Sequence, residues 1–288
     1  MKGKLFGATK TDYILSAMLI ILAIIILFPF YNAILISIVS ETEYVRSEFL
    51  LFPKKLNFSS YSYLFEDGRI LNGMKVTAFV TIVGCAYNMF LTVFCAYALS
   101  KPFFGRKVFT YLIIFTVYFS GGLIPYYMLM KNIGLMDSLW AMILPTAIEF
   151  TYMIVIRRHI EEIPQSLLEA AEVDGAGYVK TLFIIVFPLV KPIIVTFALY
   201  YAVDRWNEWW NGMLFIKTAA KQPLQLILRS IVEDASTDSA SAAISGRAIF
   251  GDGIKMAATV LSMLPVMIIY PFLQRFFISG MTMGAVKE

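Results

Sequence analysis

Charged residues, cysteine and histidine are all scarce in this sequence, and each shortage narrows the classes of protein that fit. Only 15% of the 288 residues are charged, whereas a soluble globular domain carries about 25%. The two cysteines, Cys85 and Cys95, lie in one apolar run, where a helix would separate them by about 15 Å. That separation excludes a disulfide between them. The single histidine, His159, argues against a histidine metal cluster or a histidine-based active site.

Two kinds of functional pattern are also missing. The phosphate-binding pattern Gly-x-x-x-x-Gly-Lys-Ser/Thr does not occur, so we expect no nucleotide or other cofactor on this chain. The basic residues, which give a net charge of +4, do not gather into a stripe, so nucleic acid is not an expected partner. No set of nucleophile and base or of metal ligands stands out, and we therefore expect neither enzyme activity nor a metal site.

Long apolar runs dominate what is present. Hydrophobic residues make up 59% of the chain, and the mean hydropathy is +0.73. A helix that crosses a bilayer needs about 20 apolar residues, so we predict an all-α polytopic membrane protein with six transmembrane helices. The transmembrane domain is residues 13–278, between an N-terminal segment 1–12 and a tail 279–288. The predicted spans are 13–39, 74–99, 108–130, 138–156, 181–203 and 254–278.

The distribution of basic residues predicts the orientation of these spans. Six spans place both termini on one side of the membrane. The face that holds the termini, the short loop 101–107 and the segment 157–180 carries more basic than acidic residues, whereas the two are balanced on the other face. Basic residues are retained in the cytoplasm, so both termini and the segment 157–180 are predicted to be cytoplasmic.

A short acidic island interrupts the apolar sequence between the fourth and fifth predicted spans. Pro164 suits the first turn of a helix, and three apolar residues then fall on one side of that helix. Gly175 can take the left-handed conformation that ends a helix, and a second helix is predicted to start near Gly177. We expect a helix-turn-helix knob in the water, with an apolar face and a charged rim.

These residues carry a family resemblance. Glu169-Ala170-Ala171, with Gly175 four residues later and Phe187-Pro188 further on, resemble the EAA loop of the permeases of ABC importers, although Phe187 stands where that family mostly has leucine. In that family the loop, here residues 159–180, is a coupling helix seated in a groove of a cytoplasmic ATPase. The resemblance therefore implies an ATPase-coupling set, namely Leu167, Leu168, Glu169, Ala170, Ala171, Asp174, Gly175 and Ala176.

Other segments narrow the resemblance to one branch of the family. Asp174-Gly175-Ala176 together with Lys191-Pro192 is similar to the carbohydrate permeases. Segments 119–125 and 132–141, with 274–277 and 284–287 near the C-terminus, resemble the polysaccharide and complex-oligosaccharide subgroup of the LplC/YtcP type. The match covers most of the chain from Ala96 onward.

The resemblance also implies partners. The chain would be a multi-pass subunit in a bacterial plasma membrane, surrounded by lipid, and would pair with a second, homologous permease. Two cytoplasmic ABC ATPase subunits would hold ATP and Mg²⁺, and an extracytoplasmic sugar-binding protein would deliver an oligosaccharide or a polysaccharide fragment.

Two charges fall well inside the predicted spans, and a charge at that depth marks function. Lys191 is close enough to the cytoplasmic end of its span to snorkel to the surface. Glu149 lies nearer the middle of its span, where it either lines a polar path or pairs with another span.

An aromatic stretch follows the fifth predicted span. Trp206, Trp209 and Trp210 are spaced so that a continuous helix would carry three indoles on one face, with Arg205 and Glu208 near enough to pair. Such a face suits a sugar, but it also fits the aromatic belt of a membrane interface. Carbohydrate-type permeases have a similar Trp-Asn-Glu patch at this place, which favours the sugar. The predicted substrate path is Glu149, Tyr200, Tyr201, Trp206, Asn207, Glu208, Trp209 and Trp210.

A long outer loop is predicted at residues 217–253, with a polar centre at 234–242, and a similarly long outer segment at 40–73. The resemblance places the loop 217–253 toward the binding protein. The alternative function is a self-sufficient secondary transporter or channel that uses an intramembrane charge such as Glu149 for ion coupling. The scarcity of charges and the lack of repeated halves count against that alternative.

Overall fold

The computed structural model describes residues 10–47, 50–66, 68–237 and 250–283, and over these ranges the chain is helical with no β-strand. The predicted all-α class is therefore confirmed. The chain divides into two compact units, one made of Met1–Gly68 with Ser230–Met263 and the other of Arg69–Arg229 with Leu264–Glu288. Residues before Lys10, residues 238–249 of the predicted outer loop and residues 284–288 of the predicted tail lie outside the described part.

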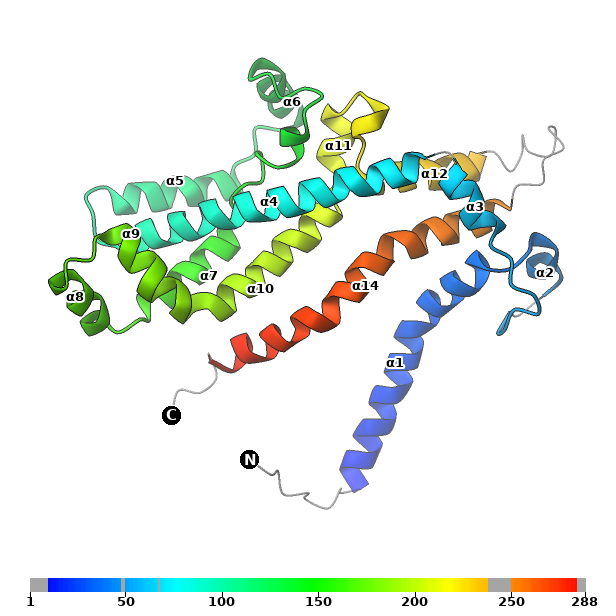
Figure 1. Ribbon diagram of the computed structural model, residues 1–288, viewed down its shortest axis with the longest axis horizontal. Helices are drawn as coiled ribbons and strands as arrows, with labels where there is room; N and C mark the ends of the chain where they lie inside the picture. The colour runs from blue at the N-terminus through cyan, green and yellow to red at the C-terminus, as the bar shows by residue number, and fades with distance from the viewer. Residues whose placement is uncertain (1–9, 48–49, 67, 238–249, 284–288) are drawn as a thin grey trace. The chain divides into compact units, whose positions relative to one another are not determined.

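The first unit begins with a long apolar helix. Helix α1 (Lys10–Ser37) is drawn in blue in Figure 1. It exposes large apolar side chains along most of its length. A surface of that kind is stable in lipid rather than in water. Two short helices follow, α2 (Glu41–Arg46) and α3 (Ser59–Glu66). The hydroxyls of Ser37 and Tyr61 lie 2.9 Å apart and tie α3 to the end of α1.

Helices also occupy much of the predicted segment 217–253. The short 3-10 helix η3 (Ala219–Lys221) and the α-helix α12 (Leu224–Thr237) precede the undescribed stretch, and α14 (Gly251–Met283) follows it. Within the second unit, the first turns of α12 bury Leu224, Ile227 and Leu228, which is the spacing of a helix with one apolar face. The prediction of a loop over the whole of 217–253 is therefore wrong in the part that the structure describes.

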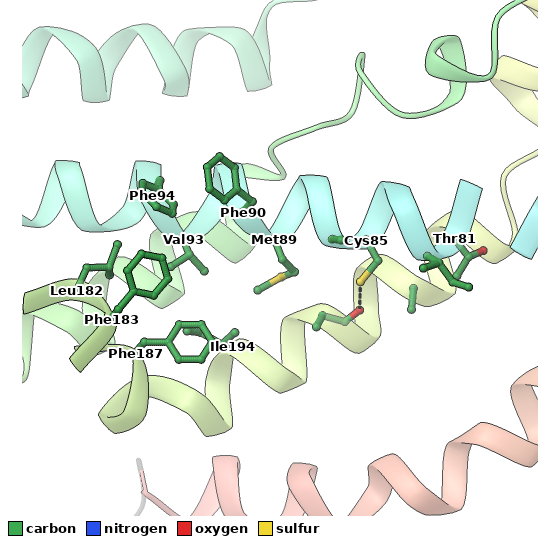
Figure 2. Close-up of a pocket in the computed structure, with 14 residues that line it drawn as sticks. Thr81, Cys85, Met89, Phe90, Val93, Phe94, Leu182, Phe183, Phe187 and Ile194 are labelled. Carbon is green, nitrogen blue, oxygen red and sulfur yellow. Dashed lines mark hydrogen bonds between the residues drawn. The ribbon is translucent and has the colours of Figure 1, made fainter. Parts of the chain in front are cut away.

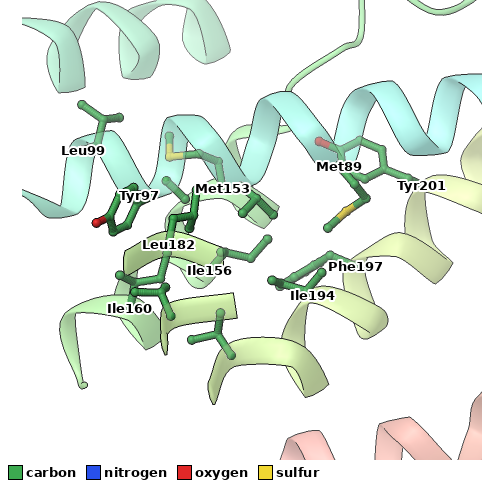
Figure 3. Packing of buried hydrophobic residues seen from close by; sticks show 14 residues of the cluster. Met89, Tyr97, Leu99, Met153, Ile156, Ile160, Leu182, Ile194, Phe197 and Tyr201 are labelled. Carbon is green, nitrogen blue, oxygen red and sulfur yellow. The ribbon is translucent and has the colours of Figure 1, made fainter. Parts of the chain in front are cut away.

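The core of the second unit lies among three helices. Helices α4 (Arg69–Ser100), α7 (Phe150–Glu161) and α10 (Phe187–Trp206) pack along one another (Figure 1). Figure 3 shows their shared apolar cluster, in which Met153 and Ile156 of α7 have no exposed surface. Helix α4 packs directly against both α10 and α7, so these three helices form the centre of the unit.

Four described helices are long and apolar enough to cross a membrane. They are Thr11–Ser37, Arg69–Ser100, Tyr178–Trp206 and Gly251–Ile269. A fifth candidate is the broken pair α5 (Arg106–Tyr118) and α6 (Leu123–Asn132), which are bent by 118°. The protein is therefore a multi-pass membrane protein with four or five spans by the length and composition of its described helices, against the six predicted.

The predicted fourth span, 138–156, is not one helix. It contains the 3-10 helix η1 (Leu139–Met142), an irregular stretch and then α7, whose twelve residues reach only about 18 Å. Irregular backbone at membrane depth is tolerated where protein surrounds it, and Met142 and Ile143 are fully buried. Side chains also bond the freed carbonyls: Arg205 donates to the Met142 oxygen and Asn88 donates to the Thr146 oxygen at 3.4 Å.

Candidate functional site

The acidic island forms the knob that the sequence predicts. Helix α8 (Gln165–Val173) starts directly after Pro164 and ends in a turn at Gly175, whose φ is +74°. The amide of Gly175 donates to the Glu172 carbonyl at 3.0 Å and that of Ala176 to the Ala171 carbonyl at 2.9 Å, which is the Schellman pattern of a glycine-ended helix. The short helix α9 (Tyr178–Thr181) follows. We call residues 164–181 the knob.

The apolar side chains of the knob divide between two directions. Ala171 is 6% exposed and Leu168 packs against the core of the second unit, so these two attach the knob to the helices behind it. Leu167 and Val173 are 46% and 88% exposed, and Ala170 between them is exposed as well. The outward face of α8 is therefore an apolar stripe that nothing in the described part covers.

The acids of the knob differ from those just before it. Glu161 pairs with Arg106 and, at 3.0 Å, with Arg157, and Glu162 pairs with Arg158. By contrast, among the described residues no ion pair involves the three acids of the knob. These acids are Glu169, Glu172 and Asp174, and all three are exposed. The knob therefore presents uncompensated negative charge around its apolar stripe.

The knob joins α10 through a local irregularity. The five residues Leu182–Val186 form a π-helical segment, η2, between α9 and α10. Pro188 and Pro192 follow in α10, and since proline has no N–H, two backbone carbonyls here lose their usual partners. Segments of this kind occur often at functional sites, and this one makes the knob and the span behind it one continuous element from Tyr178 to Trp206.

The predicted path residues gather in two places, and Tyr201 marks the first. Tyr201 is 1% exposed. Its hydroxyl lies 2.8 Å from that of Thr92 and accepts a hydrogen bond from the Glu149 amide at 2.7 Å. Glu149 is not in the middle of a helix, because it caps the start of α7 by accepting from the Thr151 amide at 3.4 Å. Tyr200, which precedes Tyr201 on α10, is 43% exposed.

The sequence reasoning missed two residues of this first group. Tyr152 stacks on Phe197 and on Tyr200, with ring centroids 4.8 and 5.7 Å apart. Its hydroxyl donates to the Asp204 carboxylate at 3.1 Å. The spacing of Tyr152 three residues after Glu149, and of Asp204 four after Tyr200, places each pair on one helix face. That signal was available in the sequence.

The second group lies where α10 ends. The helix stops at Trp206, and α11 (Trp210–Phe215) starts a new direction. The prediction that one helical face carries Trp206, Trp209 and Trp210 is therefore wrong. A buried polar network determines the break: Arg205 and Glu208 lie 3.7 Å apart and are 6% and 9% exposed at their side chains, as the sequence predicted for this pair. We call residues 205–221 the corner.

The network fixes the corner to its surroundings. The Glu208 carboxylate accepts from the Asn211 amide at 2.9 Å and from its side chain at 3.1 Å. Asn211 in turn accepts from the Tyr126 hydroxyl at 2.7 Å. Gly84 makes room for Arg205, since a Cβ there would lie 3.1 Å from the arginine Cδ. Glu208 thus bonds protein groups instead of facing an open path.

The two remaining tryptophans of the corner are unequal. The guanidinium of Arg229 lies 4.2 Å above the ring of Trp209, a cation–π contact. Trp209 meets Trp210 edge to face, with centroids 5.5 Å apart, and Trp210 remains 43% exposed. Trp210 is therefore exposed, whereas Trp206 and Trp209 are partly buried.

A charged clamp closes the corner. Asp137, at φ +55°, accepts from the Lys217 and Thr218 amides at 3.0 and 2.9 Å and from Lys221 Nζ at 2.9 Å. Hydrogen bonds from Thr218 and Lys221 hold the pKa of Asp137 well below its usual range. No sequence pattern signalled this clamp, because its members are far apart in the chain.

An apolar cavity of about 510 Å³ lies between α4 and α10. Figure 2 shows Met89, Phe183 and Phe187 around it, with the Cys85 thiol donating to the Ala198 carbonyl at 3.1 Å. A sugar needs several polar partners, and this wall offers almost none. We therefore do not place the sugar path there.

In the described ranges no three His, Cys, Asp or Glu side chains converge as metal ligands.

These features define a class: a membrane-embedded helical protein with a short polar helix-turn-helix knob between two apolar elements. The chain belongs to the family of binding-protein-dependent transport system inner membrane components, whose model matches residues 77–283. It is 38% identical over 290 residues, 100% of both chains, to YtcP of Bacillus subtilis (strain 168), a polygalacturonan/rhamnogalacturonan transport system permease protein. It is also 38% identical over 265 residues to protein LplC of the same organism, covering 91% of this chain and 90% of LplC.

A solved structure agrees with these relatives. The chain matches part of a bacterial ABC transporter involved in the import of the acidic polysaccharide alginate. The TM-score is 0.85 at 30% sequence identity, over 94% of this chain and 99% of that one. The predicted resemblance to ABC permeases of the LplC/YtcP type is thereby confirmed.

Proposed function

We propose that this chain is one of two homologous permease subunits of an ATP-driven importer for an oligosaccharide or a polysaccharide fragment. Its family depends on binding proteins, and its relative YtcP and its structural neighbour have names that specify polysaccharides. The complex lies in the bacterial plasma membrane. Two cytoplasmic ATPase subunits hold ATP and Mg²⁺, and an extracytoplasmic sugar-binding protein delivers the substrate.

Six segments cross the membrane in this proposal. They are α1, α4, the bent pair α5 and α6, the run from η1 through α7, the continuous element from α9 through α10, and α14. An even number of spans and the excess of basic residues on one face leave both termini in the cytoplasm. The knob is then cytoplasmic, and the corner, which follows the fifth span, is extracytoplasmic.

The observation that carries the proposal is the knob itself. It presents an apolar stripe and acids that make no ion pair among the described residues. A surface of this composition is a site for a protein partner with a basic, partly apolar groove. We assign ATPase contact to its exposed residues and attachment to Leu168 and Ala171. Gly175 and Ala176 make the turn that sets the angle of α8.

The path residues take different roles in this proposal. Tyr201 and Glu208 are buried and hydrogen-bonded. They do not touch the sugar in this proposal and instead position neighbouring residues of the path. Glu149 and Tyr200 line the path in the membrane, together with Tyr152 and Asp204. At the corner, where the substrate enters, the contacting residues are Trp206, Asn207, Trp209 and Trp210. Aromatic faces pack on the C–H face of a sugar while carboxylates and amides accept its hydroxyl hydrogens.

Transport requires two states of this unit. Closure of the ATPases on ATP moves the knob, and the continuous element from Tyr178 to Trp206 transmits that movement from the cytoplasmic face to the corner. Nucleotide and loaded binding protein each favour one of the two states, which is how a ligand biases a bistable element.

Reconstitution tests this function. Proteoliposomes that contain the chain, its second permease and the ATPases should take up saccharide only with internal ATP and external binding protein. Liposomes that contain this chain alone should take up none. Uptake by the chain alone, driven by an ion gradient, would instead establish a secondary transporter.

A further inference from the structure

A small pocket lies between the knob and the end of α4. Its volume is about 190 Å³, and Tyr97, Glu172, Ala176, Gly177, Tyr178 and Thr181 line it. Figure 1 shows α9 beside the end of α4. Tyr97 and Thr181 are 6% and 3% exposed and form its floor, whereas Glu172 and Tyr178 are exposed and form its rim.

The floor of this pocket has an unused polar atom. The Tyr97 hydroxyl is buried and has no hydrogen-bond partner in the described structure. Figure 3 shows this oxygen directed away from the apolar cluster around Met153. A buried hydroxyl without a partner costs free energy, so its presence at the floor of a pocket indicates a group that arrives from outside the chain.

The rim determines the chemistry of that group. The Glu172 carboxylate makes no ion pair within the described residues, and no basic side chain lines the pocket. The Thr181 hydroxyl already donates within the chain, toward the Gly177 carbonyl at 3.2 Å. Lys101 lies over the Tyr97 ring, 5.4 Å from its centroid, outside the pocket. The unsatisfied groups are therefore a carboxylate at the rim and a phenol oxygen below it.

We propose that this pocket receives a lysine or arginine side chain of the ATPase subunit, with its cationic end bonded to Glu172 and Tyr97. Only a long, thin side chain reaches past the rim to the floor, and a cation is the donor that a carboxylate and a phenol oxygen accept best. The pocket is a contact separate from the apolar stripe of α8. The inference rests on the proposed function, since it requires an ATPase partner.

Retention of the ATPase by the purified complex at increasing salt tests the proposal. Glu172→Gln removes the charge and Tyr97→Phe removes one oxygen. We expect each to weaken retention about fivefold to tenfold, and Glu172→Gln also to reduce the salt dependence. The double variant should be little weaker than the single ones, because both side chains bind one cation. Glu41→Gln, a matched loss of charge at an exposed position of α2 outside the coupling loop, should change retention less than about twofold.

Three results would overturn the proposal. If the wild-type complex retains the ATPase and the Glu172→Gln and Tyr97→Phe variants retain it equally well, the pocket is filled by water and not by an ATPase side chain. Additive losses in the double variant would show that the two side chains bind different groups. An equal loss in Lys101→Met would show that Lys101 of this chain fills the pocket. If the wild-type chain retains no ATPase at all, it is the proposed function that fails.

Discussion

The knob lies beside the C-terminal end of α4, whereas the corner lies along the middle and first half of that helix, with Arg205 against Gly84 (Figure 1). The two regions use polar side chains in opposite ways. At the corner, Arg205 and Glu208 are buried and bonded to each other and to neighbouring groups. At the knob, Glu169 and Glu172 are exposed and have no ionic partner in the described part of the chain. Both regions adjoin the continuous element from Tyr178 to Trp206, the knob at its start and the corner at its end.

This difference in burial assigns the two regions different roles: the polar groups of the corner stabilise the fold, and those of the knob are available to bind another protein. A buried, ion-paired network determines where backbone elements go, because breaking it leaves a charge without compensation. An exposed acid beside an apolar stripe contributes little to folding and is available to another protein. Substitutions at the corner should therefore act on stability, and substitutions at the knob on association and coupling.

The largest effect is expected at the corner. Arg205→Met should destabilise the protein by about 3–5 kcal/mol, because it leaves the Glu208 carboxylate buried without its cation. Thermal unfolding in nanodiscs measures the loss. The double variant Arg205→Met with Glu208→Leu should be clearly more stable than the single variant. If Arg205→Met unfolds at the same temperature as the wild type, the ion pair of the corner does not stabilise the fold.

The next effect belongs to the knob. Leu167→Asp should weaken ATPase retention by about 2 kcal/mol, as for a central apolar contact of an interface. It should leave the unfolding temperature nearly unchanged, since exposed substitutions cost within about 0.5 kcal/mol. Phe104→Asp, at a fully exposed position in the loop after α4, is the control and should leave retention intact. If Leu167→Asp and Phe104→Asp weakened ATPase retention equally, the knob would not be the specific contact for the ATPase.

A smaller effect is expected from the exposed tryptophan of the corner. Trp210→Ala should reduce saccharide uptake by about 1 kcal/mol, the scale of one aromatic contact, at equal amounts of assembled complex. Tyr118→Ala, which truncates an exposed aromatic of α5, is the matched control. Normal uptake by Trp210→Ala would contradict a sugar contact and would favour the alternative that these indoles form an aromatic belt at the membrane interface.

The smallest effect concerns the clamp of Asp137. Because its pKa is held below the ordinary value, its contribution is present above the unfolded pKa and is lost only as pH falls through the folded one. Amide exchange at Thr218 should therefore stay slow and unchanged, after correction for intrinsic rates, between about pH 5 and pH 8. Asp137→Asn should speed this exchange across the range, and a wild-type midpoint near pH 5 would contradict the account.

The two regions also differ in how far the sequence predicts them. The knob is encoded locally: Pro164 begins its helix, Gly175 ends it, and both predictions are confirmed. The corner depends on contacts between distant residues, such as Arg205 with the Met142 carbonyl. Spacing alone therefore predicted a continuous helix through Trp210, which is wrong because α10 ends at Trp206. The pairing of Arg205 with Glu208 was predicted because the two are close in sequence.

The spans show the same limit. Apolar length predicted the continuous helices well, since α4 is 32 residues long and contains the predicted span 74–99. It did not predict the bend between α5 and α6 or the irregular stretch before α7. The irregular stretch depends on buried side chains that satisfy its freed carbonyls, Asn88 among them, and such contacts are not visible as a hydrophobic run. The bend falls at Gly122, whose φ is +89°, and apolar length takes no account of a glycine turn.

The ATPase rate of the reconstituted complex, with and without loaded binding protein, tests the central claim most directly. Gly175→Val forces a β-branched residue into the left-handed region, whereas Gly175→Asn places there a residue that tolerates it. A Cβ at Gly175 meets nothing within 4 Å, so the two variants differ in backbone preference and not in clashes. We predict that Gly175→Val inserts and folds but loses stimulation by the binding protein, and that Gly175→Asn keeps it. Full stimulation in Gly175→Val would contradict the claim that the knob couples ATP hydrolysis to transport.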